Sequence, residues 1–385
     1  MSKKVMSLLL AFTLVFSIAL TRCGKQDQGT TPEQSTGEAT QQQTEGNAEE
    51  TPAEPVKVGM ATDSGTIDDK SFNQGTWEGI QKYAEDHPGV VETKYLQPSG
   101  EQHTDYLNAM NDLIDTGHTI IVTPGFKFET AVNEAATNNP DVSFILIDGQ
   151  THNGDGNFVK HDNTVCVFFN EHEAGFLAGV AAALSTKTNK LGFIGGMEIP
   201  PVQKFGWGYQ AGVAYANKTY GTQAEIVDYI YQGTFDDVAG GQTLAAGMYD
   251  KGVDIIFHAA GGVGVGVFNE AKERAEKGQE VYVIGVDVDQ YEAGKISSGK
   301  SVTLTSAVKG VDTAAYNYID AKLNGTFPGG EVVTLGLKDN AVGLPKENPN
   351  LSEDTIKKVE ETVQQVLDGK LTIPATQEEL DAFLK

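Results

Sequence analysis

Six residues of the chain have the chemistry to hold a flat ligand that carries hydroxyl groups: Asp63, Phe72, Asn73, Phe235, Asp287 and Lys309. Two phenylalanine rings can stack on the two faces of an aromatic base, and an Asn amide can both donate to and accept from its edge. The carboxylate of Asp287 can accept hydrogen bonds from two vicinal hydroxyls, while Lys309 can keep that carboxylate ionised or bind a hydroxyl itself. Together these groups meet the needs of a purine nucleoside.

Three of these residues also have a purely structural interpretation. Phe72 could belong to the hydrophobic core, Phe235 could pack at the start of a helix, and Asp287 could cap a following helix. The neighbouring Asp68 and Asp69 are interpreted as N-cap or surface residues of the first helix rather than as ligand contacts.

The sequence lacks the usual catalytic and cofactor motifs. It contains no P-loop, no G-x-S-x-G elbow and no H-E-x-x-H. The glycine-rich run 261–266 does not fit G-x-G-x-x-G because residue 267 is Val. This run, which begins with Gly261, is interpreted as a strand-to-helix turn whose amides can approach a ligand or simply pack tightly. Residues 171–173 (Glu-His-Glu) are consecutive on a predicted helix and point in different directions, so they cannot share a metal ion. We therefore expect no catalytic residue, no cofactor and no metal site.

The elements that must position the candidate residues alternate between strand and helix after residue 55. Short, nearly continuous apolar runs predict parallel strands covered on both faces, and they lie at 56–62, 119–125, 142–149, 190–196, 253–261 and 281–287. Segments with helical period lie at 73–86, 102–116, 127–138, 171–184, 203–219, 236–250 and 264–277. This order predicts a doubly wound α/β architecture.

Roughly ten strands are too many for one ordinary sheet, so the sequence predicts two α/β lobes. We assign residues 56–170 and 303–345 to lobe 1 and residues 171–302 to lobe 2. Residues 346–385 contain helical segments that the sequence does not assign to either lobe. Because ligands bind beyond the carboxyl ends of parallel strands, the candidate residues are expected to surround one cleft between the lobes.

The first 55 residues have the features of an export and anchoring segment. Two lysines and the apolar run 5–20 predict a signal peptide at residues 1–22, with an uncleaved anchor helix as the alternative. Cys23 lies in a segment that resembles a bacterial lipobox and is the predicted lipidation site, although Arg22 replaces the usual small residue. Residues 24–55 contain no large apolar residue and have seven acids against one lysine. We therefore expect residues 23–55 to form a lipidated cysteine followed by a disordered acidic tether.

The negative charge of the chain restricts the partners it can have. There are 28 Lys and Arg against 53 Asp and Glu, which gives a net charge of −25. A net charge this negative argues against nucleic-acid binding, which needs a basic face, and against an electrostatic attraction to an anionic membrane surface. Its two cysteines, Cys23 and Cys166, lie in such different contexts that no disulfide is expected. Cys166 lies in an apolar strand and is interpreted as buried and inert.

Several segments together resemble the basic membrane lipoprotein family, also called Med or purine-nucleoside-receptor-like substrate-binding proteins. The segments that carry the resemblance are Asp63–Gly79, Glu173–Ala182, Gly195–Gly212, Gly233–Asp237, Gly261–Phe268, Val283–Gln290 and Leu304–Asp312. The resemblance extends from Val56 to about Leu344. It implies a type I periplasmic-binding-protein fold and a lipoprotein that delivers nucleosides to the permease of an ABC transporter.

The resemblance also implies a role for each candidate residue. By motif, Phe72 and Phe235 resemble the pair that stacks on the base, and Asp63 and Asn73 resemble the group at the base edge. Asp148, which ends an apolar strand, fits the cleft but is matched less closely. The residues that resemble the group around the ribose are Gly261, Asp287 and Lys309.

We therefore expect a monomeric substrate-binding lipoprotein, anchored on the extracytoplasmic face of the cell membrane, that binds guanosine, inosine or adenosine for uptake. A sugar- or riboflavin-binding protein of the same fold is the alternative within this class. A nucleoside hydrolase, or a surface interaction protein without ligand binding, would be an alternative of another class.

Overall fold

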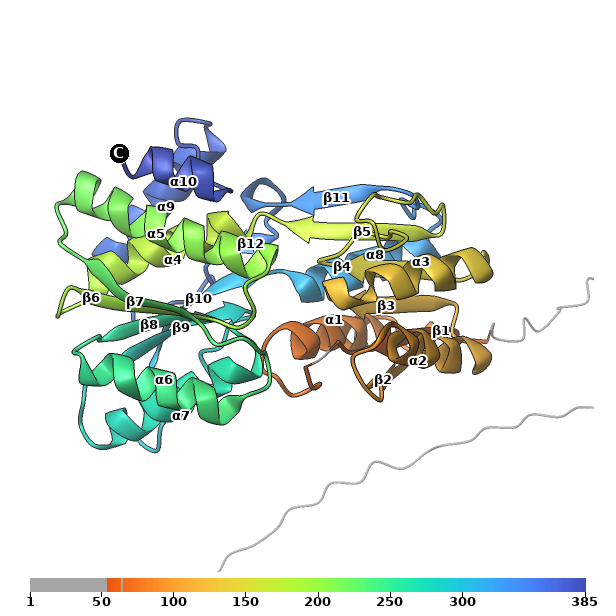
Figure 1. Ribbon diagram of the computed structural model, residues 1–385, viewed down its shortest axis with the longest axis horizontal. Coiled ribbons are helices and arrows are strands. Elements are labelled where there is room, and N and C mark those ends of the chain that lie inside the picture. The colour runs from red at the N-terminus through yellow and green to blue at the C-terminus, as the bar shows by residue number, and fades with distance from the viewer. Residues whose placement is uncertain (1–53, 64) are drawn as a thin grey trace, which may run out of the picture. The chain divides into compact units, whose positions relative to one another are not determined.

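The computed structural model describes residues 54–63 and 65–385, which form two lobes, each built on a six-stranded sheet (Figure 1). The predicted signal peptide (1–22), Cys23 and the tether as far as residue 53 lie outside the described residues. The predicted architecture of two doubly wound lobes is confirmed by the order and direction of the strands.

The sheet of lobe 1 consists of parallel strands in the order β2-β1-β3-β4-β5-β11. The strands are β1 (Val56–Ala61), β2 (Val91–Leu96), β3 (Ile120–Pro124), β4 (Ser143–Ile147), β5 (Thr164–Phe169) and β11 (Val332–Leu335). The helices are α1 (Phe72–Asp86), α2 (His103–Asp115), α3 (Glu129–Asn138) and α8 (Val311–Leu323), with the 3₁₀ turn η1 (Phe126–Phe128). Alternate residues of β4 explain why both faces are covered: Ile145 and Ile147 pack with the α1 and α8 side, and Leu146 packs with the α2 and α3 side.

The sheet of lobe 2 has the order β7-β6-β8-β9-β10-β12, in which only β12 is antiparallel to its neighbour. Its strands are β6 (Lys190–Gly195), β7 (Glu225–Tyr231), β8 (Ile255–Ala259), β9 (Tyr282–Asp287), β10 (Thr303–Lys309) and β12 (Val342–Gly343). Helices α4 (Glu171–Ser185) and α5 (Pro200–Tyr220) cover one face, and α6 (Val238–Asp250) and α7 (Gly262–Glu276) cover the other (Figure 1). The 3₁₀ turn η2 (Leu337–Asp339) precedes β12.

The C-terminal region, which the sequence did not assign, belongs to lobe 2. Helix α9 (Glu353–Leu367) packs on α4, and the short helix α10 (Gln377–Phe383) packs on α5. Trp207 of α5 donates its indole N–H to Gln377 across this contact, at 3.0 Å. Residues 346–385 therefore extend the helical layer of lobe 2 and form no separate domain.

The prediction that residues 303–345 belong to lobe 1 is wrong at both ends of that range. Strand β10 pairs with β9, and β12 pairs with β10, so both strands lie in the sheet of lobe 2. Only α8 and β11 return to lobe 1. An apolar strand such as β10 has the same sequence pattern in either sheet, because strand pairing depends on long-range contacts that the local pattern does not contain.

Helices α4 and α5 approach each other closely because glycines face the contact. A Cβ added to Gly212 would lie 2.1 Å from the carbonyl oxygen of Phe176, and one added to Gly208 would lie 2.1 Å from that of His172. No larger residue fits without separating the helices. This close packing matters for the ligand site, because α5 thereby covers the first turn of α4.

Candidate ligand-binding site

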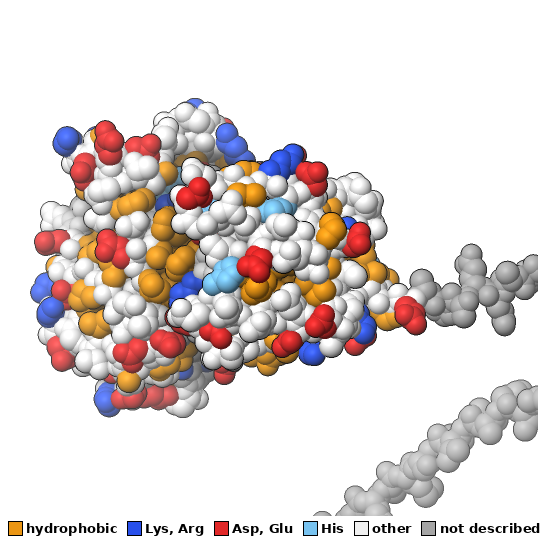
Figure 2. Space-filling view, turned by 45° about the vertical axis from the view of Figure 1, so that its right-hand side comes forward, with side chains coloured by type: hydrophobic (Ala, Val, Ile, Leu, Met, Phe, Trp, Pro, Cys, Tyr) orange, Lys and Arg blue, Asp and Glu red, His pale blue; other side chains and the backbone are white. Residues whose placement is uncertain are grey.

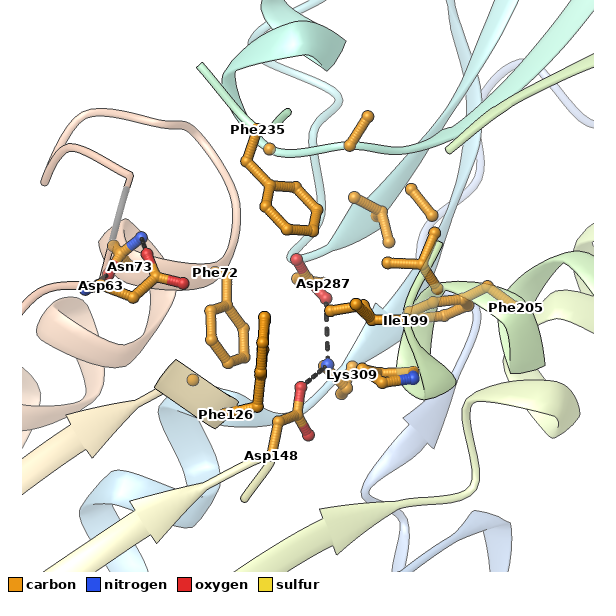
Figure 3. Close-up of a pocket in the computed structure, with 17 residues that line it drawn as sticks. Asp63, Phe72, Asn73, Phe126, Asp148, Ile199, Phe205, Phe235, Asp287 and Lys309 are labelled. Carbon is orange, nitrogen blue, oxygen red and sulfur yellow. Dashed lines mark hydrogen bonds and ion pairs between the residues drawn. The ribbon is translucent and has the colours of Figure 1, made fainter. Parts of the chain in front are cut away.

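A pocket lies between the lobes, at the carboxyl ends of strands from both sheets (Figure 3). It has an empty volume of about 590 Å³, part of which is open to solvent. Its lining consists of Asp63, Phe72, Asn73, Gly125, Phe126, Asp148, Ile199, Pro201, Val202, Phe205, Phe235, Ala259, Ala260, Gly261, Val286, Asp287 and Lys309.

All eight candidate residues line this single pocket. Lobe 1 contributes Asp63, Phe72, Asn73 and Asp148, and lobe 2 contributes Phe235, Gly261, Asp287 and Lys309. The structure thus brings together side chains that lie up to 246 residues apart, since 309 − 63 = 246. That these side chains contact a ligand stays a prediction.

Aromatic rings from both lobes face the pocket. Phe72 is the first residue of α1, and Phe235 lies in the loop before α6; both are half-buried and rest on the core with part of the ring. Figure 3 shows Phe72 and Phe126 on the lobe 1 side, with Phe235 across from them. Neither Phe72 nor Phe235 is therefore a plain core residue.

The sequence did not single out the apolar wall of lobe 2 as a whole. Phe205 of α5 is only 2% exposed and lines the pocket, whereas the nearby Trp207 does not. Phe126, in the turn after β3, also lines the pocket. Phe126 could have been identified from the sequence because it directly follows a predicted strand. Phe205 and Trp207 could not be told apart, because the local sequence does not show which of the two faces the pocket until α5 is packed on the sheet.

Asp63 and Asn73 have unequal roles. The Asn73 amide nitrogen donates to Asp63 Oδ1 (2.8 Å) and to Asp69 Oδ2 (3.0 Å), while its oxygen accepts from the Asp63 backbone N–H (3.1 Å). Both amide donors are thereby used. The Asp63 carboxylate also accepts from Gly65 N–H at 2.8 Å through Oδ1, which leaves Oδ2 as its oxygen without a donor among the described residues. We therefore interpret Asn73 as positioning Asp63, and a contact between Asn73 itself and the base edge stays a prediction.

Burial raises the pKa of Asp63, and the hydrogen bonds from Gly65 and Asn73 oppose that rise. The two donors hold the carboxylate in one orientation, because both reach the same oxygen. The other oxygen is left as a fixed acceptor at the pocket wall.

Asp148 and Asp287 occupy equivalent places in the two lobes. Asp148 follows β4 and Asp287 ends β9, and these are the fourth strands of two sheets that share one strand order. Both residues have positive φ, 56° and 63°, a conformation that costs energy for residues other than glycine and that clusters at functional sites. Asp287 caps no helix; its Oδ2 accepts from the Ser71 hydroxyl of lobe 1 at 2.5 Å instead.

Lys309 lies between these two carboxylates (Figure 3). Its ammonium donates to Asp148 Oδ2 at 2.5 Å and lies 3.8 Å from Asp287 Oδ1. It also lies 4.7 Å from the centre of the Phe72 ring, within the range of cation–π attraction. Burial alone would lower the pKa of Lys309, but the surrounding carboxylates, Asp148 foremost, raise it.

Asp287 and Asp148, the two carboxylates that flank Lys309, differ in the hydrogen bonds and charges that stabilise their ionised form. Burial raises the pKa of Asp287 to about 6, against the lowering effects of Lys309 and Ser71. Asp148 Oδ1 is buried and has no hydrogen-bond partner among the described residues. Since buried polar atoms are nearly always hydrogen-bonded, this oxygen is available to a donor group of a ligand.

Gly261 forms the turn between β8 and α7, as predicted. Its φ of 53° is unfavourable for other residues, and α7 begins at the next residue. Cys166 is 1% exposed in β5, and burial raises the pKa of its thiol, which fits the interpretation of an inert side chain.

Two parallel-sheet lobes around one shared pocket define a solute-binding protein of the periplasmic-binding-protein type. A solved ABC transporter solute-binding protein from Aeropyrum pernix matches with a TM-score of 0.72 and 28% identity, covering 86% of this chain and 98% of that one. The family model described as ABC transporter substrate-binding protein PnrA-like matches residues 56–377. The chain therefore belongs to this family of ABC transporter substrate-binding proteins, as the sequence motifs predicted.

Two curated relatives show the extent of the similarity. The "CD4+ T-cell-stimulating antigen" of Listeria monocytogenes is 39% identical over 326 residues, covering 82% of this chain and 87% of that protein. The "ABC transporter nucleoside-binding protein BmpA" of Lactococcus lactis is 36% identical over 329 residues, covering 83% and 89%. Proteins of this family are solute-binding proteins rather than enzymes.

The surface of the described part carries both charges. Acidic and basic side chains alternate over the face that Figure 2 shows, and that face has no extended basic patch. None of the helices in residues 54–63 and 65–385 combines the length and apolarity that a membrane crossing requires.

Proposed function

We propose that this substrate-binding protein takes up purine nucleosides and makes no chemical change to them. The observation that carries the proposal is the placement of Phe72 and Phe235, one from each lobe, on the walls of a pocket that also holds carboxylates from both lobes. The printed name of the Lactococcus lactis relative supports a nucleoside as the ligand. The ligand would join the lobes by contacting both, which is how two-lobed binding proteins close.

At the base end, the proposal assigns recognition to Asp63. Its Oδ2 is an acceptor held in place by the donors on Oδ1. An ionised carboxylate is an acceptor only, so it pairs best with a base whose edge carries N–H donors. The 6-oxopurines, guanine and hypoxanthine, have such an edge at N1, whereas adenine has an acceptor there. We therefore expect guanosine and inosine to bind more tightly than adenosine.

At the sugar end, the proposal assigns the ribose hydroxyls to the carboxylates around Lys309. Asp148 Oδ1 has no donor among the described residues, and Asp287 lines the same part of the pocket. Vicinal hydroxyls can donate to both carboxylates. Lys309 would offset the negative charge of this pair and need not contact the ligand itself.

The cellular setting forms part of the same proposal. A signal peptide, lipidation at Cys23 and an acidic tether would hold the two-lobed body outside the cytoplasmic membrane. The body would then deliver its ligand to the permease subunits of an ABC transporter. Mass spectrometry of the protein extracted from its own membranes tests the anchor, since lipidation at Cys23 predicts an N-terminal lipopeptide and loss of residues 1–22.

Calorimetric titration with guanosine, inosine, adenosine, cytidine, riboflavin and ribose tests the ligand. We expect one-to-one binding of a purine nucleoside and no saturable binding of ribose alone. A ligand at a hundred times its dissociation constant should also stabilise the fold by about 2.7 kcal/mol in thermal unfolding. Binding of only a sugar or riboflavin would contradict the assignment of the base contacts, and release of free base from a nucleoside would contradict a non-enzymatic role.

Guanosine 5′-monophosphate is expected to bind at least about 100-fold more weakly than guanosine. Among the described residues, the lining contains three carboxylates, Asp63, Asp148 and Asp287, and one ammonium, which is already paired. A phosphate would lose its hydration and meet charges of its own sign, a cost of several kcal/mol, with each 1.4 kcal/mol worth tenfold in affinity. Calorimetry with 5′-O-methylguanosine separates charge from size. Equal affinities for the nucleoside and its phosphate would contradict the prediction.

A further inference from the structure

Glu171 is a buried carboxylate beside the pocket that takes no part in the proposed ligand contacts. It is the first residue of α4, its side chain is 1% exposed, and it does not line the pocket. Its Oε1 lies 3.8 Å from Lys309 Nζ, and its Oε2 is buried with no hydrogen-bond partner among the described residues. Its nearest cation is Lys204, whose Nζ lies 3.3 Å from Oε2, and a buried carboxylate oxygen without a hydrogen bond is still costly.

The neighbours of Lys309 are divided unequally between the lobes. Glu171, on α4, and Asp287, on β9, belong to lobe 2 together with Lys309 itself, which ends β10. Among the described residues, Asp148 receives the only hydrogen bond from Lys309 and is its single partner in lobe 1. Any separation of the lobes therefore removes Asp148 and leaves Glu171 and Asp287 beside the ammonium.

The position of Glu171 along the chain is also special. The chain passes from lobe 1 to lobe 2 between β5 and α4, and it passes back after Lys309, between β10 and α8. Glu171 and Lys309 thus lie next to two of the segments that connect the lobes. An ion pair between them would stay inside lobe 2 in every arrangement of the lobes.

We propose that Glu171 is a positioning residue: it holds Lys309 in lobe 2 when the lobes separate, and Lys309 exchanges Glu171 for Asp148 when they close. The inference rests on the proposed function in one respect, namely that ligand binding accompanies closure. In the arrangement described here, Lys309 donates to Asp148, and Glu171 Oε2 has no hydrogen bond among the described residues and keeps only the ion pair with Lys204.

The exchange links closure to pH. Burial raises the pKa of Glu171 to about 7 in the closed arrangement, against the lowering effects of Lys309 and Lys204 and with Asp148 adding to the rise. Lys204 Nζ of α5 lies 3.3 Å from Glu171 Oε2. The adjacent His172 stays neutral, because burial lowers its pKa to about 4.

The sign of the pH effect follows from this difference between the two arrangements. A carboxyl whose pKa is higher when closed favours closure at low pH, and this contribution disappears as the pH rises through about 7. In the open arrangement Asp148 is withdrawn and Lys309 pairs with Glu171, so the pKa of Glu171 is lower there, and ligand binding weakens as the pH rises through about 7.

Small-angle X-ray scattering of the ligand-free protein at pH 8 tests the exchange without any ligand. Glu171→Gln removes the partner of the open arrangement, so we expect a smaller radius of gyration than in the wild type. Glu198→Gln, which removes the same charge from an exposed site near the cleft, is the matched control and should leave the radius unchanged. An equal or larger radius for E171Q would overturn the proposal.

A second variant and a second measurement guard against a folding defect. Asp148→Asn removes the partner of the closed arrangement, so the ligand-free radius should exceed that of the wild type, and an unchanged radius would overturn the proposal. The ratio of guanosine affinity in E171Q to that in the wild type should rise from pH 5.5 to pH 8, and a ratio independent of pH would overturn it too. The other carboxylates of the pocket are the same in both proteins of this comparison, so the ratio isolates Glu171.

The outcomes separate this inference from the proposed function. If the radius changes as expected but no nucleoside binds, the ligand assignment fails and the exchange stands. If nucleosides bind but the radius and the pH dependence of E171Q match the wild type, the exchange fails and the ligand assignment stands.

Discussion

Phe235→Ala is expected to weaken guanosine binding by about 5- to 150-fold, because stacking of a base on an aromatic side chain is worth about 1–3 kcal/mol. Phe235 is a half-buried loop residue, so its truncation should change the melting temperature little. Phe72→Ala should have a similar or larger effect, since the Phe72 ring also lies 4.7 Å from the Lys309 ammonium. Calorimetric titration of both variants measures the loss.

The control for this experiment is Phe158→Ala. Phe158 is 40% exposed and does not line the pocket, so the same truncation there should leave guanosine affinity unchanged. If F235A and F72A bind guanosine as tightly as the wild type, the two rings do not stack on the ligand and the proposed function loses its main support.

Asp63→Asn is expected to weaken guanosine binding by about 100-fold or more and to weaken adenosine binding much less. The variant can keep the oxygen that accepts from Gly65 and Asn73, because Oδ1 makes both contacts. Its amide then replaces Oδ2 and turns an acceptor into a donor. Guanine would meet donor against donor, and a site built around a hydrogen bond rejects strongly a ligand that cannot make it.

The change in preference between the two nucleosides, rather than the loss of affinity alone, is the informative result. Asp68→Asn removes the same charge at an exposed position nearby and should leave the preference unchanged. Equal losses for guanosine and adenosine in D63N would show that Asp63 does not contact the edge of the base.

The sequence predicted the elements of the fold better than their assignment to a lobe. Strands β3 and β4 are continuous apolar runs, and the structure buries every residue of both. Strand β10 has a comparable pattern, but nothing in its residues specifies β9 as its neighbour, and its lobe was assigned wrongly. Local periodicity determines that a strand forms, whereas its pairing depends on the rest of the chain.

For the site, too, the sequence predicted local features but not the long-range contacts between side chains. Residues at strand ends, such as Asp148 and Asp287, could be found because parallel sheets place these ends at one edge. The hydrogen bonds between side chains could not be found, so the contact between Asn73 and Asp63 was not foreseen and Glu171 was considered only as a metal ligand. Glu171 is buried because α5 lies across the first turn of α4, a contact that depends on Gly208 and that a charged residue at a helix start does not suggest.

The matched positions of Asp148 and Asp287 have a consequence for the direction in which a ligand lies. If the two lobes were identical, the cleft between them would bind an unsymmetrical molecule equally well in two opposite orientations. The next strand in each sheet removes this ambiguity, because β5 ends in Phe169 where the equivalent β10 ends in Lys309. Lys309 lines the pocket whereas Phe169 is fully buried outside it, so an ammonium enters the cleft from lobe 2 with no counterpart at the equivalent strand end of lobe 1, and this difference gives the cleft one polarity.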